Sequence, residues 1–246
     1  FQANSNYLME RTEETLGLLY AMHWPFRQPE SSRGVRKSVL HDRLDKAGAC
    51  FGEMCGWERV NWFAKSGMKA RYEYSFSRQN WFDASAEEHH SAREKVAMFD
   101  MSSFAKFLVQ GRDAEKVLNR ICANNVNVSS GKVIYTPWLN ERGGIEADLT
   151  VTRLREDVFF VVTAGASQIR DLAWLRKNIP QDANLNVTDV TSGYAVMSVM
   201  GPDGRLVNGW SPFGDTDEEI RENMKTGYMP NAPDAERRFK CQRLGS

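Results

Sequence analysis

One carboxylate, Asp148, lies in a strongly alternating stretch of the chain, close in the pattern to an aromatic residue, Tyr135. Residues 135–154 read as a β-hairpin, with an apolar arm, a turn rich in Asn, Arg and Gly, and a second arm that alternates between apolar and polar residues. Gly143 and Gly144 can adopt the positive φ angles that a tight turn needs. Pairing across this turn places Tyr135 opposite Asp148, or within a pair or two of it, where the ring could stack on a flat ligand.

The alternation in the second arm assigns its side chains to two faces, because side chains in a strand alternate with period two. One face takes the apolar residues Ile145, Ala147, Leu149 and Val151, and the other takes Glu146, Asp148, Thr150 and Thr152. An ordinary half-exposed strand with a solvated aspartate has the same pattern, since acidic residues are common on the wet face of a strand. The pattern alone leaves both interpretations open.

Length and composition indicate a globular protein rather than a nucleic-acid or membrane binder. The chain has 246 residues, enough for one large domain or two small ones, and 32 basic residues balance 32 acidic ones. A formal net charge of zero gives no electrostatic reason to expect nucleic acid or an anionic membrane as partner. No apolar run approaches the roughly 18 residues of a membrane span, and no signal peptide is visible.

The cysteines and histidines do not have the spacing of a metal site. Cys50 and Cys55 could form half of a zinc site, but no second Cys/His pair follows at a suitable interval. His89 and His90 are adjacent in an expected helix, where they project about 100° apart and are poorly placed to chelate one ion. We therefore expect no metal, and reduced structural thiols in a reducing compartment.

Local signals predict an alternation of helices and strands. Helices are predicted over residues 5–19, 85–96, 113–122 and 167–179. Ser5 and Ser85 are the predicted N-caps of the first two. The apolar run 157–163 predicts a buried strand, and the strand–helix–strand order around it indicates an α+β or α/β layer structure, of which we expect the α+β class.

Residues 140–151, Asn-Glu-Arg-Gly-Gly-Ile-Glu-Ala-Asp-Leu-Thr-Val, are similar to the folate-binding hairpin of the aminomethyltransferase family. That family includes the T-protein of the glycine cleavage system and the C-terminal half of sarcosine and dimethylglycine dehydrogenases. The resemblance implies that Asp148 contacts the pterin side of tetrahydrofolate and is the catalytic residue. It also implies three folate-contacting residues: Tyr135 against the pteridine, Met101 in the run Phe-Asp-Met-Ser, and Thr163 at the end of the buried strand.

Other segments resemble the flavin-dependent oxidoreductases that carry such a domain. The run from residue 10 to 25 resembles the end of their flavin domain, and the run from 38 to 63 resembles their small central domain. The resemblance implies a flavin-domain remnant at 1–37, a central domain with linker at 38–92, and the first part of an aminomethyltransferase domain at 93–210. Residues 211–246 predict a poorly packed tail. FAD would bind only in a preceding domain, and the sequence has no Gly-x-Gly-x-x-Gly run.

The resemblance implies a reaction with two centres. A flavin domain oxidises an N-methylated glycine to an iminium, and tetrahydrofolate in this part of the protein captures the one-carbon unit as methylene-tetrahydrofolate. The expected partners are therefore a small-molecule substrate and folate. A non-catalytic regulatory relative, of the pyruvate dehydrogenase phosphatase regulatory subunit type, or an inactive truncated product, is the alternative. We expect a cytoplasmic location in a bacterium, or the mitochondrial matrix in a eukaryote.

Overall fold

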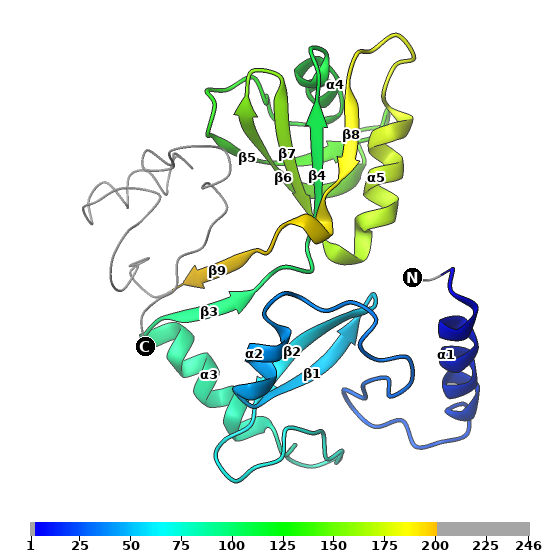
Figure 1. Cartoon of the computed structure of the whole chain (residues 1–246), viewed down its shortest axis with the longest axis vertical. Helices are drawn as coiled ribbons and strands as arrows, with labels where there is room; N and C mark the ends of the chain where they lie inside the picture. The colour runs from blue at the N-terminus through cyan, green and yellow to red at the C-terminus, as the bar shows by residue number, and fades with distance from the viewer. Residues whose placement is uncertain (1–2, 201–246) are drawn as a thin grey trace. The chain divides into compact units, whose positions relative to one another are not determined.

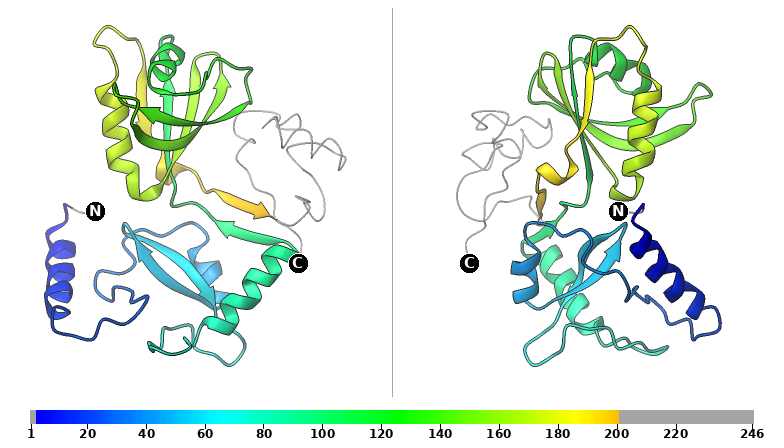
Figure 2. Two further views of the ribbon diagram at one scale, coloured as in Figure 1. Left: turned by 180° about the vertical axis from the view of Figure 1, so that it is seen from behind. Right: turned by 45° about the vertical axis from the view of Figure 1, so that its right-hand side comes forward.

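A computed structural model describes residues 3–200 of the chain, which divide into two compact units (Figures 1 and 2). Residues up to Asp100 belong to the first unit and residues 101–198 to the second. The predicted boundary at residues 37 and 38 falls inside the first unit, and the domain boundaries inferred from resemblance stay predictions. The predicted tail, residues 211–246, lies outside the described residues.

The first unit is built around a two-stranded antiparallel hairpin and three helices. Its elements are α1 (Ser5–Gly17), α2 (His41–Lys46), β1 (Ala49–Met54), β2 (Trp57–Phe63), α3 (Phe82–Glu94) and β3 (Ala97–Asp100). The turn between β1 and β2 uses Cys55 and Gly56, both at positive φ. A small core forms where Cys50 and Trp62 of the hairpin pack against Ala84 of α3.

Both predicted N-caps in this unit are wrong. The side chain of Asn4, one residue before Ser5, accepts a hydrogen bond from the amide of Tyr7 at 3.1 Å and caps α1. α3 begins at Phe82, so Ser85 is already inside the helix, and its amide donates to the carbonyl of Trp81. Trp81 packs against the first-unit core, and this burial starts the helix earlier than the capping preference alone would.

The second unit contains a five-stranded antiparallel sheet in the order β5-β6-β7-β4-β8. Its elements are β4 (Ala105–Gln110), α4 (Ala114–Ile121), β5 (Val133–Leu139), β6 (Ile145–Arg155), β7 (Val158–Thr163), the 3₁₀ turn Gly165–Ser167, α5 (Gln168–Lys177), β8 (Asn186–Asp189) and the 3₁₀ turn Thr191–Gly193. The last strand among the described residues, β9 (Met197–Met200), ends in two residues that belong to the first unit, and it pairs with β3 in a two-stranded sheet.

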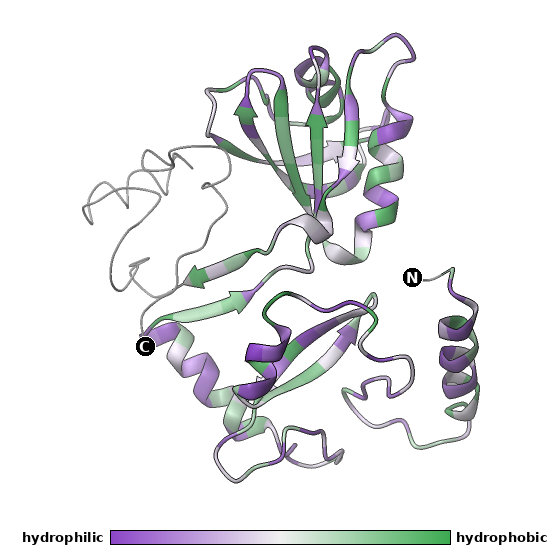
Figure 3. Cartoon of the chain, viewed as in Figure 1, coloured by the Kyte–Doolittle hydropathy of each residue, from purple (hydrophilic) through white to green (hydrophobic). Residues whose placement is uncertain are grey.

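The core of the second unit lies between one face of this sheet and the two helices. Figure 3 shows its central strands as mainly hydrophobic. Buried residues on this face include Phe107, Trp138, Leu149 and Phe159. The predicted amphipathic stripe of α4 is confirmed, because Ala114, Val117, Leu118 and Ile121 are all buried. Helices packed on an antiparallel sheet confirm the expected α+β class.

None of the helices within residues 3–200 is both long and apolar enough to cross a membrane.

Candidate functional site

The predicted hairpin forms, and its register brings the two leading site residues together. β5 pairs with β6 so that Pro137 lies opposite Asp148 and Tyr135 lies opposite Thr150. Asp148 is two residues before Thr150, the partner of Tyr135, so its side chain lies on the same face of the sheet as that of Tyr135. The two residues are therefore diagonal neighbours across the hairpin. Gly143 takes φ +78° in the turn, as the glycine pair predicts.

The Asp148 carboxylate affects the ionisation of the Tyr135 phenol. Its ability to accept a hydrogen bond from the phenol, together with its charge, raises the pKa of Tyr135, because both favour the protonated phenol. Both side chains are exposed, Tyr135 to 64%. The pair thus presents a carboxylate acceptor and one aromatic ring to solvent.

The sheet face that carries this pair is hereafter the outer face. Further along it, Leu154, Val158 and Phe160 form a second small core with Val190 and Tyr194, whose ring meets that of Phe160 edge-on at 5.3 Å. The segment after β8 therefore covers part of the outer face. The Tyr135–Asp148 end stays accessible.

The structure does not bring Thr163 to this pair. Thr150 lies opposite Val162 in the β6–β7 register, so Val162 shares the outer face and Thr163 points to the opposite side of the sheet. Thr163 is buried, and its hydroxyl donates to the carboxylate of Asp171 on α5 at 2.6 Å. Its side chain thus connects β7 to α5 through this hydrogen bond.

Met101 lies in the turn that precedes β4, two strands away from β6 in the sheet order. Its amide donates to the carbonyl of Val196 at 2.8 Å, and its side chain is half-buried. The structure records no contact between Met101 and the Tyr135–Asp148 pair, and its role as a folate contact stays a prediction.

Sequence reasoning missed Lys106, a fully buried lysine on the outer face. Its ammonium donates to the carbonyls of Ser102 and Thr191, each at 2.9 Å, and ties the turn before β4 to the segment after β8. Lys106 lies opposite Val162, which lies opposite Thr150, which in turn lies opposite Tyr135. This row of opposed residues places Lys106 on the same face of the sheet as Tyr135. The only signal in the sequence is a charged residue inside an apolar run.

Sequence reasoning also missed the contacts that hold the second arm of the hairpin to α5. The Arg170 guanidinium donates to the Asp171 carboxylate at 3.0 Å and to the carbonyl of Glu146 at 2.7 Å. Glu146 is two residues before Asp148 on the same strand. Arg170 and Asp171 thereby fix the strand that carries the candidate carboxylate.

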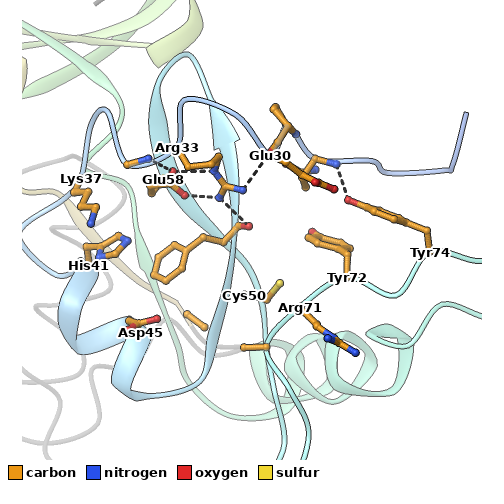
Figure 4. Close-up of a pocket in the computed structure, with 16 residues that line it drawn as sticks. Glu30, Arg33, Lys37, His41, Asp45, Cys50, Glu58, Arg71, Tyr72 and Tyr74 are labelled. Atoms are coloured by element: carbon orange, nitrogen blue, oxygen red, sulfur yellow. Dashed lines mark hydrogen bonds and ion pairs between the residues drawn. The ribbon is translucent and has the colours of Figure 1, made fainter. Parts of the chain in front are cut away.

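A cavity of about 620 Å³ lies in the first unit, and none of the predicted site residues lines it (Figure 4). On its wall Arg33 donates from Nε to Glu58 at 2.9 Å, and the ring of His41 stacks on Phe51 with 4.3 Å between centroids. Burial raises the pKa of the Cys50 thiol in this wall to about 11, so the thiol is protonated and unreactive at neutral pH. Within residues 3–200 no group of three or more His, Cys, Asp and Glu side chains is arranged to hold a metal ion.

Comparison with known proteins assigns most of the chain to two families. Residues 40–215 match the GCVT N-terminal domain, and residues 1–38 match the FAD dependent oxidoreductase central domain. The crystal structure of glycine cleavage system aminomethyltransferase T from Bartonella henselae has a TM-score of 0.55 and 25% identity, covering 69% of this chain and 41% of that one.

The curated relatives of this chain are considerably longer than the chain itself. The 4-methylaminobutanoate oxidase (formaldehyde-forming) of Paenarthrobacter nicotinovorans is 48% identical over 89% of this chain and 27% of the relative. The mitochondrial pyruvate dehydrogenase phosphatase regulatory subunit of Mus musculus is 34% identical over 82% of this chain and 24% of its own length. Human mitochondrial dimethylglycine dehydrogenase is 28% identical over 90% and 26%.

The chain thus spans about a quarter of the length of these relatives. The matches confirm the predicted resemblance: the chain belongs to the GCVT domain family, and the dimethylglycine and sarcosine dehydrogenases are among the proteins to which it is similar.

Proposed function

We propose that this chain is the folate-binding part of an FAD-dependent oxidoreductase of N-methylated amino acids, with tetrahydrofolate bound against the outer face at Tyr135 and Asp148. The observation that carries the proposal is the Tyr135–Asp148 pair on the family's folate hairpin. A pterin carries N–H groups on a flat ring. An exposed carboxylate can accept from such groups, and an exposed phenol ring offers a surface for stacking.

Asp148 has the chemistry that one-carbon capture needs. Bound tetrahydrofolate supplies amine nitrogens that accept a one-carbon unit at the oxidation level of formaldehyde. Asp148 can take the proton that such an amine loses, or stabilise the positive charge that develops beside it. Tyr135 lies diagonally across the hairpin from this carboxylate, and we assign its ring a stacking role against the pteridine.

The residues that suit folate have no counterpart for FAD in this chain. The sequence contains no Gly-x-Gly-x-x-Gly phosphate-binding run, and residues 1–38 match only the central domain of the oxidoreductases. We derive no step at a flavin from this chain. The substrate, an N-methylated amino acid, is inferred from relatives such as 4-methylaminobutanoate oxidase and dimethylglycine dehydrogenase.

Titration of the purified chain with a reduced folate tests the proposal, with quenching of its 7 tryptophans as readout. We expect saturable binding that Asp148→Asn weakens by about tenfold, the effect of losing a hydrogen bond to a charged group. Asp157→Asn is the matched control, because Asp157 is also an exposed aspartate of this sheet, in the turn after β6. Equal effects of the two variants would contradict the assignment.

A second candidate is a regulatory protein that uses the same fold without chemistry. The 34% identical phosphatase regulatory subunit favours this alternative. It predicts no saturable quenching by millimolar reduced folate, in contrast to the proposal above. The same titration therefore separates the two candidates.

A further inference from the structure

A second cavity of about 570 Å³ lies within the second unit, away from the outer-face pair. Three segments line it: the end of α4, the turn of the β5–β6 hairpin and the end of α5. Neither Tyr135 nor Asp148 is among its lining residues. The volume falls within the range of roughly 300–1,000 Å³ that is usual for small-molecule sites.

The cavity wall is positively charged. Each of the three segments contributes one cation, Arg120 from α4, Arg142 from the turn and Lys177 from α5, against the single carboxylate of Glu141. Within residues 3–200 none of these three cations forms an ion pair. Other arginines of the same unit do: Arg153 contacts Glu115 at 2.9 Å.

An aromatic wall accompanies the charges. Trp174 lines the cavity, and among the described residues its indole N–H has no hydrogen-bond acceptor. The Lys177 ammonium lies 5.4 Å from the centroid of the same ring. The cavity wall thus combines an aromatic ring with the Lys177 ammonium beside it.

The turn that carries Arg142 is held in place. The side-chain oxygen of Asn140 accepts from the amides of Arg142 at 3.0 Å and Gly144 at 2.9 Å, and its amide nitrogen donates to Glu146 at 2.8 Å. Arg142 therefore projects from a fixed backbone, which lowers the entropy cost of binding.

The helix ends account for only part of this arrangement. Basic residues are favourable in the last turn of a helix, where the macrodipole is equivalent to about −0.5 charge, and Arg120 and Lys177 stand at such ends. Arg142 is on neither helix. The negative charge at the cavity consists of the Glu141 carboxylate and about half a charge from each of the two helix ends. The three cations together outweigh it, so the cavity keeps an excess of positive charge.

We propose that this cavity binds a small organic anion that carries at least two negative charges beside an aromatic ring. Arg120, Arg142 and Lys177 bind the carboxylate or phosphate groups, and the ring lies near the Trp174 indole. The site is independent of the folate proposal. Carboxylate and phosphate have the same attraction for these cations, and two probes separate them.

Isothermal titration calorimetry of the full chain with isophthalate and with phenyl phosphate tests the site. We expect saturable binding of at least one probe, weakened by added salt and lowered about tenfold by Arg142→Gln or Lys177→Gln. Arg176→Gln is the matched control, because Arg176 is an exposed neighbour on α5 that does not line the cavity. Asp148→Asn should leave this binding unchanged.

Stronger binding of phenyl phosphate would identify a phosphate ligand, and stronger binding of isophthalate a dicarboxylate; either supports the site. The proposal is overturned if neither probe saturates at about 10 mM. It is also overturned if Arg176→Gln weakens binding as much as Lys177→Gln, since that result would indicate diffuse attraction by the surface.

Discussion

Substitution of Thr163 by valine separates a structural residue from a folate contact. The Thr163 hydroxyl is buried and donates to the Asp171 carboxylate at 2.6 Å, and Asp171 is 1% exposed. Valine keeps the shape of the side chain and removes this donor, leaving Asp171 with Arg170 as its charged partner. A buried hydrogen bond to a charged group contributes roughly 1.5–3 kcal/mol, and the added methyl group offsets part of that.

We therefore expect Thr163→Val to lower the free energy of unfolding by about 1.5 kcal/mol. For a chain of this length that corresponds to a fall in Tm of about 3–6 °C, measurable by differential scanning calorimetry. Thr150→Val is the matched stability control, because Thr150 is half-buried on the neighbouring strand and its hydroxyl makes no hydrogen bond within residues 3–200. It should leave Tm nearly unchanged.

The affinity of Thr163→Val for reduced folate should equal that of the unmodified chain, because its side chain points away from the outer face. A variant with unchanged Tm and weakened folate binding would refute this reasoning. It would place Thr163 among the folate contacts, as the family resemblance implies.

Two further substitutions test the framework of each unit. Burial favours a higher pKa for Glu58, but hydrogen bonds from Arg33 and the Gly34 amide outweigh it and hold the pKa below its usual value. The stabilisation is therefore present above pH 4.5, the ordinary value, and is lost as the pH falls through the lowered pKa. We expect Glu58→Gln to lower the free energy of unfolding by about 2 kcal/mol at pH 7. Stability followed by circular dichroism should then depend less on pH in the acid range than in the unmodified chain. An unchanged dependence on acid pH would contradict this pairing. Gly111→Ala should cost about 2 kcal/mol or more in urea denaturation, since φ is +141° and a Cβ would lie 2.4 Å from the Asn184 carbonyl oxygen; a neutral result would rule out this contact.

The hairpin was predictable because its two signals are local. Alternation around Asp148 sets the faces, and Gly143 with Gly144 sets the turn, so Tyr135 had to fall near Asp148. How closely the phenol and the carboxylate approach each other depends on side-chain rotamers, which the pattern does not specify.

The orientation of Thr163 was not predictable from its strand. Residues 158–162 are apolar on both faces, because both faces of β7 are covered, so period two gives no sign of which side Thr163 takes. The partner Asp171 lies on a helix whose placement depends on the whole sheet. Ser85 failed as a cap for a related reason, since the packing of Trp81 outweighed a local preference.

The second cavity was also beyond the sequence. Arg120, Arg142 and Lys177 lie in three separate segments, and only tertiary packing brings them to one wall. Each is an unremarkable surface cation when considered along the chain.

Fluorine NMR of the chain labelled with 3-fluorotyrosine tests the central claim most directly. The chain has 7 tyrosines, and Tyr135→Phe assigns the signal of the residue beside Asp148. We predict that a reduced folate shifts the Tyr135 signal saturably, and that Asp148→Asn weakens this response. A Tyr135 signal that stays unchanged while folate binding saturates would contradict the account.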